Sequence, residues 1–275
     1  MHFQPLLVSF CYPDLAQVSD NVTFMNTFPT DKPHLLQRLE QEAHIWLTRP
    51  EEITAADQLQ EYLSLLSVRE IERYQQFRFD EDRHRYLVSH ALVRSALSAY
   101  VDVGPASWQF SSNAYGRPEI SGPDIAPSLR FNLTHTAGLV ACIVTLQLDC
   151  GIDAEKVSAR GNLTGVAEKL FAASEQQALK GLAGEALLEG FFSYWTLREA
   201  YCKALGVGIA HSKRNYRFLR ESNGQWTIDI DAPSGDAMSS WQFALMKPTT
   251  EHLLAVAMRT ADLADKAIVT SFVVP

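Results

Sequence analysis

The order in which two kinds of hydrophobic periodicity follow one another constrains the fold of this chain more than any other feature. Over residues 54–100, apolar residues such as Leu59, Leu63 and Leu66 recur at every third or fourth position, which is typical of helices. A β-rich stretch follows over 129–155, and the helical pattern then returns before the remainder alternates as short strands. Sequential strands with short polar turns favour antiparallel pairing. We therefore predict an α+β fold with antiparallel sheets packed with helices.

Local signals place the individual elements. Pro50 stops the first strand, and Ser174 with Gln177 forms a capping box that predicts a helix from Glu175 onward. A second helix ends at Gly206, because glycine readily adopts the left-handed conformation of a helix stop. The strands at the C-terminal end of the chain are expected to form an antiparallel meander. The predicted strands cover 43–47, 129–133, 139–148, 151–155, 216–219, 226–230, 241–245, 253–258 and 268–274, and the second helix covers 191–205.

A weak internal sequence similarity suggests that the chain has two related halves. His90 and Arg94 stand four residues apart, as do Glu199 and Lys203, and in both places alanine follows the first residue and Ala-Leu closes the segment. This similarity suggests two related α+β halves that join near residue 150. The lead before the first strand shows no clean period and is expected to have weakly specified structure. The predicted division is an N-terminal extension over 1–42, an N-terminal α+β half over 43–149 and a C-terminal α+β half over 150–275, with the active site in the cleft between the halves.

Charge and composition exclude several classes of protein. The formal net charge is −8, whereas nucleic-acid-binding domains carry a basic excess, so we expect no nucleic-acid partner. The four cysteines show no CxxC spacing, which favours reduced and buried thiols. The start of the chain lacks the basic region of a signal peptide, and the longest apolar run, 139–148, is about half of a membrane span. We expect a soluble, cytoplasmic protein without a membrane partner.

Six arginines gather in the helical stretch between residues 69 and 94. Paired with acidic residues one turn away, they would form a solvated helix face. Guanidinium groups also match phosphate in planar, bidentate geometry, so the same residues could form an anion-binding wall. The charge pattern alone leaves both interpretations open. The arginines are Arg69, Arg73, Arg78, Arg83, Arg85 and Arg94.

Two acidic motifs carry the strongest chemical signal. Asp153 and Glu155 stand two residues apart on a predicted strand, so both carboxylates project from the same face. Carboxylates this close repel each other, and a hard divalent cation is the usual reason to tolerate them, although an exposed polar strand edge is the alternative. Glu199 and Lys203 share one face of the predicted second helix. Their apolar and aromatic neighbours favour a site over a surface salt bridge.

A third motif ends the strand over 129–133 with a hydroxyl, an imidazole and a second hydroxyl, supplied by Thr134, His135 and Thr136. Together with the glycine at position 138, these groups can turn several donors toward one anion, although a lone histidine is often structural. With the neighbouring motifs, this segment resembles the 4′-phosphopantetheinyl transferase superfamily, specifically the Sfp type. The matching segments are Gly116-Arg117-Pro118, Phe131 to Thr136, Gly151 to Glu155 and Trp195 to Lys203, which correspond to G-x-P, F-N-x-S-H-S, G-x-D-x-E and W-x-x-K-E-A-x-x-K.

The resemblance covers roughly residues 43–260 and implies two similar α+β halves that form a pseudo-dimer. It also implies a role for each matching position, including Mg²⁺ ligands, contacts to coenzyme A and a candidate general base. The implied Mg²⁺ ligands are Asp153, Glu155 and Glu199; the phosphate contacts are Thr134, His135 and Lys203; Arg117 and Pro118 pack on the adenine; Arg85 and Arg73 lie near the 3′-phosphate; and Glu175 is a candidate base beside Glu199.

The reaction that the resemblance implies is the Mg²⁺-dependent transfer of the 4′-phosphopantetheine arm of coenzyme A to a serine of an apo acyl- or peptidyl-carrier protein. Adenosine 3′,5′-bisphosphate would leave, and Glu199, Glu175 or a water would accept the serine proton. A metal-dependent hydrolase of nucleotide pyrophosphates and a catalytically inactive coenzyme A-binding module are the alternatives. Thr134 and Thr136 replace two serines of the family. Arg198 stands where the family has a lysine, so the role of this position in the present chain is open. The Sfp type implies a monomer.

Overall fold

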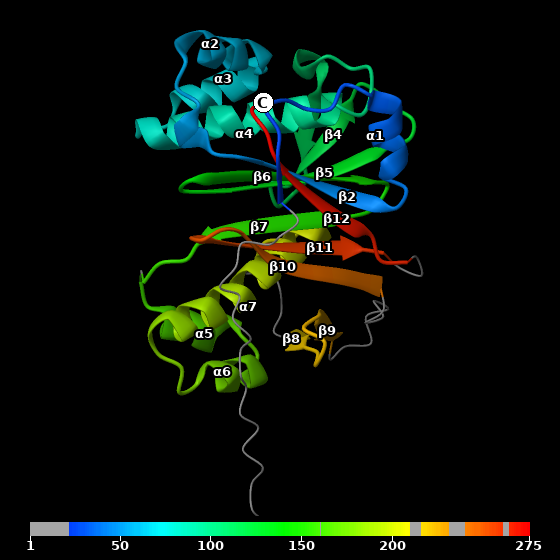
Figure 1. Cartoon of the computed structure of the whole chain (residues 1–275). Coiled ribbons are helices and arrows are strands. Elements are labelled where there is room, and N and C mark those ends of the chain that lie inside the picture. Colours follow the sequence, from blue (N-terminus) through cyan, green and yellow to red (C-terminus); the bar gives the residue numbers. More distant parts are fainter. Residues whose placement is uncertain (1–21, 160, 210–215, 231–239, 261–263) are drawn as a thin grey trace, which may run out of the picture.

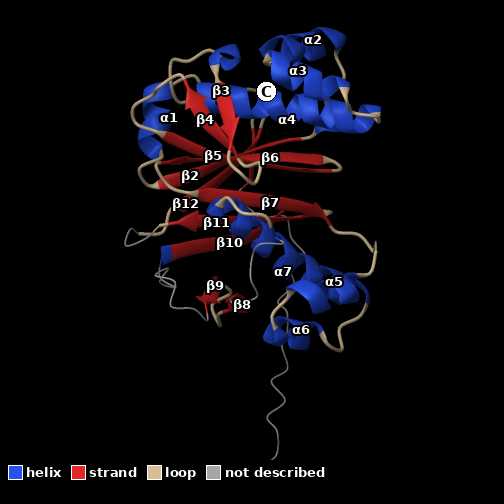
Figure 2. Ribbon diagram, turned by 180° about the vertical axis from the view of Figure 1, so that it is seen from behind, coloured by secondary structure: helices blue, strands red, loops and turns tan. Residues whose placement is uncertain are grey.

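Two five-stranded sheets lie face to face in the middle of the molecule, and a long helix covers the outer face of each (Figures 1 and 2). The computed structural model describes residues 22–159, 161–209, 216–230, 240–260 and 264–275. The elements before residue 148 are β1 (Val22–Phe24), α1 (Lys32–Arg38), β2 (Glu42–Thr48), the 3-10 helix η1 (Pro50–Glu52), α2 (Ala56–Leu65), α3 (Val68–Gln75), α4 (Asp80–Ser98), the 3-10 helix η2 (Pro105–Ser107), β3 (Gln109–Ser112), β4 (Pro118–Gly122), β5 (Leu129–Thr136) and β6 (Leu139–Leu146). The later elements are β7 (Cys150–Lys156), α5 (Leu163–Leu170), α6 (Ala173–Leu179), α7 (Gly184–Leu205), β8 (Tyr216–Arg220), β9 (Trp226–Ile230), β10 (Trp241–Thr249), β11 (His252–Arg259) and β12 (Ala267–Phe272).

The helices and sheets stack as four layers, in the order α4, first sheet, second sheet and α7 (Figure 1). The first sheet has the strand order β1-β12-β2-β6-β5, and the second has the order β7-β11-β10-β9-β8. Along β6, Val140, Cys142 and Val144 pack in the core that contains α4, whereas Ala141 and Ile143 face the second sheet. Both faces of β6 are therefore buried, which explains its continuous apolar run.

The fold class predicted from the sequence, α+β with antiparallel strand pairing and sheets covered by helices, is confirmed. Strands β7 to β11 form the expected antiparallel arrangement, and α7 ends at Gly206, which adopts the left-handed conformation with φ 70°. Within the described residues, no helix combines the length and the apolar character needed to cross a bilayer.

The last strand departs from its predicted place. The sequence puts the strand at 268–274 in the C-terminal meander, but β12 lies between β1 and β2 in the first sheet and runs parallel to both. Beyond it, Val273 N donates to Leu47 O at 2.8 Å, and the Tyr62 hydroxyl on α2 donates to Pro275 O at 2.6 Å. Periodicity identifies a strand but not its pairing partner, so the sequence could not predict this exchange.

The predicted N-terminal extension contains two well-formed elements. Strand β1 pairs with β12, and α1 buries Leu35 in the core that also contains α4. Asp31 caps α1 by accepting a hydrogen bond from His34 N at 3.2 Å, and Pro33 occupies the first turn. The expectation of weakly specified structure is therefore wrong for residues 22–42, while residues 1–21 lie outside the described part of the chain.

Candidate active site

Strand β7 presents its two carboxylates to helix α7. Ile152 and Ala154 of this strand are buried between the two sheets, so the alternate residues Asp153 and Glu155 project to the opposite side. Helix α7 packs on that side and carries Glu199 in its C-terminal part. The acidic pair of the strand and the charged pair of the helix, separated by more than 40 positions in the sequence, therefore face the same space.

Gly151 allows α7 to approach β7 this closely. A Cβ atom at this position would lie 2.0 Å from Ala200 O and 2.4 Å from Ala204 N, both of which are backbone atoms of the helix. No side chain fits at such distances, so glycine is required by close approach rather than by backbone conformation. The helix turn that contains Lys203 is thereby placed directly over the strand that carries Asp153.

Lys203 holds the Asp153 carboxylate from the helix side. Its Nζ donates to Asp153 Oδ1 at 2.7 Å, to Thr134 Oγ1 at 3.2 Å and to Ile152 O at 3.1 Å. The Thr134 hydroxyl donates to the same Asp153 Oδ1 at 3.2 Å. Asp153 is buried, and its other oxygen, Oδ2, has no hydrogen-bond partner among the described residues. A buried carboxylate oxygen is costly to leave unpaired, so this oxygen is positioned for a cation.

Two further carboxylates lie beside this one. Trp195 Nε1 donates to Glu155 Oε1 at 3.0 Å and so fixes the orientation of that side chain. Burial raises the pKa of Glu199, and the nearby Asp153 and Glu155 carboxylates raise it further, while Lys203 opposes them. Without a bound cation, burial and the repulsion of like charges both favour the protonated form of Glu199.

Strand β5 contacts the edge of β7 through side chains instead of a backbone ladder. Three alternate side chains of β5 each accept a hydrogen bond from a backbone N–H of β7, so edge strands of the two sheets are joined next to the carboxylates. The three bonds are Ile152 N to Asn132 Oδ1 at 3.1 Å, Ala154 N to Thr134 Oγ1 at 3.2 Å and Lys156 N to Thr136 Oγ1 at 3.4 Å.

The two groups of the histidine motif that were expected to contact phosphate, Thr134 and His135, lie on opposite faces of β5. The resemblance implies a phosphate contact for Thr134, and in this structure its hydroxyl contacts β7, Asp153 and Lys203. His135 lies between two inward-facing threonines and is exposed on the other face of β5. Desolvation lowers the pKa of His135, and the positive charges of Arg85 and Lys203 lower it further. The exposed imidazole therefore lies next to two cations, where it can contact an anion that they bind.

Glu175 does not join the acidic group, although the resemblance makes it a candidate base. It is 1% exposed and forms an ion pair with Arg198, which is equally buried. Its Oε1 accepts from Phe218 N at 2.7 Å and its Oε2 accepts from Ala172 N at 2.8 Å. Ala172, not Ser174, is the N-cap of α6, so the predicted capping box was misplaced. A carboxylate enclosed in this way has no access to a substrate hydroxyl.

Arg198, whose role could not be assigned from the sequence, has a structural role in the core. Its guanidinium lies over the rings of Tyr216, Phe171 and Phe218 at 4.6, 5.5 and 5.9 Å from their centroids. The planar group stacks on these rings as an ammonium group would not. Arg198 and Glu175 together tie α7 to α6 and β8 in the core beneath the second sheet.

Glu175→Gln is therefore expected to lower the free energy of unfolding by about 3 kcal/mol, because it leaves the buried Arg198 charge without a counter-ion. Urea titration at neutral pH measures the loss. The double variant Glu175→Gln/Arg198→Met removes both charges and should recover part of the stability. The kcat of the folded single variant and its pH–rate profile should match the wild type; a reduced kcat at unchanged stability would restore Glu175 as a base.

The residues predicted to lie near the nucleotide line two separate cavities. Arg73 and Pro118 line a cavity of about 530 Å³ that is partly walled by Phe131. Arg85 lines another, of about 440 Å³, near Ala137. Arg73 and Arg85 were both expected near one phosphate, but they line different cavities. Arg117, the neighbour of Pro118, is turned away from the first cavity, and its Nη1 donates to Ala204 O at 2.7 Å.

Comparison with known proteins identifies the family. The family model of the 4′-phosphopantetheinyl transferase superfamily matches residues 149–257, and that of the N-terminal part of 4′-phosphopantetheinyl transferase matches residues 53–146. The chain is 35% identical to the 4′-phosphopantetheinyl transferase HetI of Nostoc sp. over 182 residues, which are 65% of this chain and 75% of that protein. The chain belongs to the 4′-phosphopantetheinyl transferase superfamily.

Other relatives from distant organisms support this membership. A phosphopantetheinyl transferase of Thraustochytrium sp. is 30% identical over 205 residues, 70% of each chain. The 4′-phosphopantetheinyl transferase Sfp of Bacillus subtilis is 27% identical over 186 residues, 68% of this chain and 79% of that protein. The resemblance drawn from four short motifs is therefore confirmed at the level of the superfamily.

Three carboxylates of this transferase family member have the chemistry that a divalent cation needs. They are not arranged as a complete coordination site. Within the described ranges, no group of three or more His, Cys, Asp or Glu side chains is arranged to hold a metal. Asp153, Glu155 and Glu199 nevertheless supply the carboxylate oxygens that Mg²⁺ prefers, and Asp153 Oδ2 is buried without a partner. In this arrangement, Lys203 is the counter-ion of Asp153.

Sequence reasoning missed the residues that support the transferase site. Trp195 was noted as part of a motif, yet its hydrogen bond to Glu155 was not foreseen. Asn132 and Thr136 were noted only as parts of the histidine motif, whereas both join β5 to β7. The available signal was their alternation: Asn132, Thr134 and Thr136 share one face of the strand, and buried polar side chains require partners.

Proposed function

We propose that this chain transfers the 4′-phosphopantetheine arm of coenzyme A to a serine of an apo acyl- or peptidyl-carrier protein, with Mg²⁺ and with release of adenosine 3′,5′-bisphosphate. The buried Asp153 carboxylate carries the proposal, because one of its oxygens has no partner while Glu155 and Glu199 lie near it. Lys203 beside it supplies a positive charge for a pyrophosphate. Membership of the transferase superfamily supports the same reaction.

The transfer forms one phosphorus–oxygen bond and breaks another. The serine oxygen bonds to the β-phosphorus of coenzyme A, the bond from this phosphorus to the bridging oxygen breaks, and the serine proton passes to a base. Glu199 is our candidate for that base, because it lies beside the Asp153 carboxylate whereas Glu175 is enclosed in the core. Lys203 and His135 would stabilise the charge on the phosphates. Bound Mg²⁺, held by Asp153, Glu155 and Glu199, would supply further charge neutralisation.

Mass spectrometry of apo-carrier proteins tests this reaction directly. Several carriers are incubated with the protein, coenzyme A and Mg²⁺, and a gain of the phosphopantetheine mass on the target serine is expected. Chelation of the cation by EDTA should abolish the gain, and excess Mg²⁺ should restore it. Release of free phosphopantetheine without a carrier would support a pyrophosphate hydrolase instead. Coenzyme A binding that is indifferent to Mg²⁺, with no turnover, would support an inactive binding module.

Arg85→Ala tests the assignment of the second cavity to the nucleotide. Arg85 is largely buried, and its positive charge acts on His135. If Arg85 binds the 3′-phosphate, the variant should raise the KM for coenzyme A by about tenfold or more, the cost of a lost charge-assisted hydrogen bond. The KM for 3′-dephospho-coenzyme A should change little. Arg78→Ala is the control, since Arg78 lines neither cavity; equal effects on both donors would refute the assignment.

The remaining expectations about the protein stay predictions. The cytoplasmic location, the monomeric state and the absence of nucleic-acid and membrane partners rest on the sequence. Light scattering coupled to gel filtration measures the oligomeric state. Relative rates with carriers of fatty acid, polyketide and peptide synthesis would rank the acceptor proteins.

A further inference from the structure

The turn that joins β3 to β4 contacts the C-terminal end of helix α7. Arg117 Nη1 donates to Ala204 O at 2.7 Å, and Asn113 Nδ2 donates to Gly206 O at 2.8 Å. The same Asn113 side chain shapes the turn, because its Oδ1 accepts from the backbone N of Tyr115 at 2.9 Å and of Arg117 at 3.0 Å. The turn is thus fixed to itself and to the helix by one asparagine and one arginine.

The end of α7 needs these donors. The last carbonyls of a helix have no partner within it. In α7, Val207 N donates to Cys202 O at 3.0 Å and Gly206 N donates to Lys203 O at 3.1 Å. Ala204 O is satisfied by Arg117, whose positive charge also stabilises the negative end of the helix dipole.

Glycine at the helix stop makes room for this turn. Gly206 has φ 70°, and a Cβ atom there would lie 2.8 Å from Asn113 Nδ2. The left-handed conformation favours glycine at this position, and a side chain here would also displace the Asn113 amide from its contact with the helix. The contact is a packed interface between the two halves of the molecule, since the turn belongs to the first half and α7 to the second.

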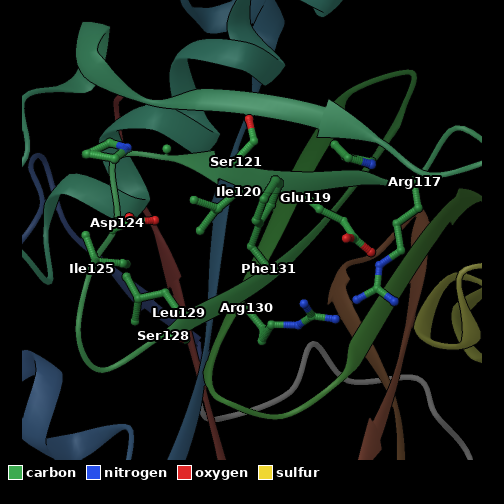
Figure 3. Close-up of a pocket in the computed structure, with 13 residues that line it drawn as sticks. Arg117, Glu119, Ile120, Ser121, Asp124, Ile125, Ser128, Leu129, Arg130 and Phe131 are labelled. Carbon is green, nitrogen blue, oxygen red and sulfur yellow. The ribbon is translucent and has the colours of Figure 1, made fainter.

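The guanidinium of Arg117 contacts the end of α7, and Arg117 does not line the cavity that contains Arg73. Its side chain is 8% exposed, and Nη2 lies 3.9 Å from Asp149 Oδ1. Arg130 Nη2 holds the same oxygen at 2.5 Å. Arg117 and Arg130 both line a pocket of about 210 Å³ beside this turn, and their guanidinium groups approach each other at the end opposite Ile125 (Figure 3). Pro118, the next residue, lines the cavity that contains Arg73.

We propose that Arg117 and Asn113 are positioning residues that hold the last turn of α7, and with it Lys203, over the carboxylates of β7. This proposal rests on the proposed function and replaces the contact to adenine that the resemblance implies for Arg117. Lys203 directly precedes Ala204, the residue whose carbonyl Arg117 caps. Pro118 on the other side of the turn lines a candidate nucleotide cavity, so the turn couples that cavity to the catalytic helix.

Steady-state kinetics and amide hydrogen exchange test this role together. The variants are Arg117→Ala, Arg117→Lys and Asn113→Ala, with Arg130→Ala as the matched control, because Arg130 also contacts Asp149 but donates to no carbonyl of α7 among the described residues. Each variant is assayed for kcat and for the KM of coenzyme A. Exchange is followed by mass spectrometry on peptides that cover residues 196–207 in the protein without substrate.

Arg117→Ala should lower kcat about ten- to a hundredfold with a nearly unchanged KM, because a displacement of about 1 Å at a distance from the chemistry can cost a hundredfold. Exchange at residues 203–207 should accelerate. Arg117→Lys should recover most of kcat, since an ammonium group can reach the same carbonyl, while Asn113→Ala should act like a weaker form of Arg117→Ala. Arg130→Ala should leave both readouts unchanged.

A raised KM for coenzyme A in Arg117→Ala, with kcat and exchange as in the wild type, would overturn the proposal and return Arg117 to the nucleotide. Equal exchange in all variants would overturn it as well. The exchange measurement needs no turnover, so it still tests the capping of α7 if the wild type transfers nothing and the proposed function fails. Should Arg117→Ala not fold, unchanged kcat and exchange in Asn113→Ala would refute the proposal, and faster exchange with lower kcat would support it.

Discussion

Gly151→Ala is expected to reduce transferase activity by more than about a hundredfold and to destabilise the protein, because the added methyl group would overlap the backbone of α7. At 2.0 Å from Ala200 O and 2.4 Å from Ala204 N, the new Cβ meets no flexible side chain that could move aside. The helix must shift as a whole, and Glu199 and Lys203 shift with it. Thermal unfolding and kcat of the purified variant measure the two effects.

Gly104→Ala is the matched control for this substitution. A Cβ atom at Gly104 would approach only Ser107 Oγ, at 3.7 Å, which is an ordinary van der Waals contact. Its Tm and kcat should therefore equal those of the wild type. If Gly151→Ala kept full activity, the close contact between α7 and β7 would not exist in solution, and the position of Lys203 over Asp153 would need another cause.

Asp153→Asn is expected to lower kcat/KM by about a hundred- to a thousandfold, since it removes a negative charge from the centre of the acidic group. The amide keeps the shape of the carboxylate and retains an oxygen for Lys203, so the fold should be preserved. Isothermal titration with Mg²⁺ in the presence of coenzyme A should show binding to the wild type and none to the variant. Circular dichroism checks that the variant is folded.

Glu251→Gln serves as the control for the loss of one negative charge. Glu251 forms an exposed ion pair with Lys156 at 3.2 Å, next to the end of β7, and surface pairs of this kind contribute little to stability. Its activity and its Mg²⁺ titration should match the wild type. Normal Mg²⁺ binding by Asp153→Asn would show that the cation lies elsewhere and would remove the main support for the proposed site.

The parts of the site that follow from local periodicity could be predicted from the sequence. Asp153 and Glu155 share a face because strand residues alternate, and Glu199 and Lys203 share a face because helix residues repeat every third or fourth position. Both rules need only neighbouring residues. The meeting of the two pairs was inferred from the family resemblance, and the structure brings Lys203 to 2.7 Å from Asp153.

The parts that depend on distant partners could not be predicted. Glu175 and Arg198 are separated by 23 positions, and nothing local indicates that they pair in the core. The family resemblance assigned Arg117 to the nucleotide, yet a buried guanidinium also satisfies carbonyl groups at a helix end. For polar side chains, the residue type limits the kinds of partner, and only the fold selects among them.

The placement of β12 has a consequence for synthesis of the protein on the ribosome. Domains of a nascent chain usually fold in the order in which they emerge. Here the first sheet needs β12 between β1 and β2, and β12 is translated after every other described strand and helix. Until it emerges, the edge of β2 that β12 will cover is unpaired and open to other strands. The first sheet is therefore expected to complete its folding only after the whole second half has been translated, although most of its strands come from the first half.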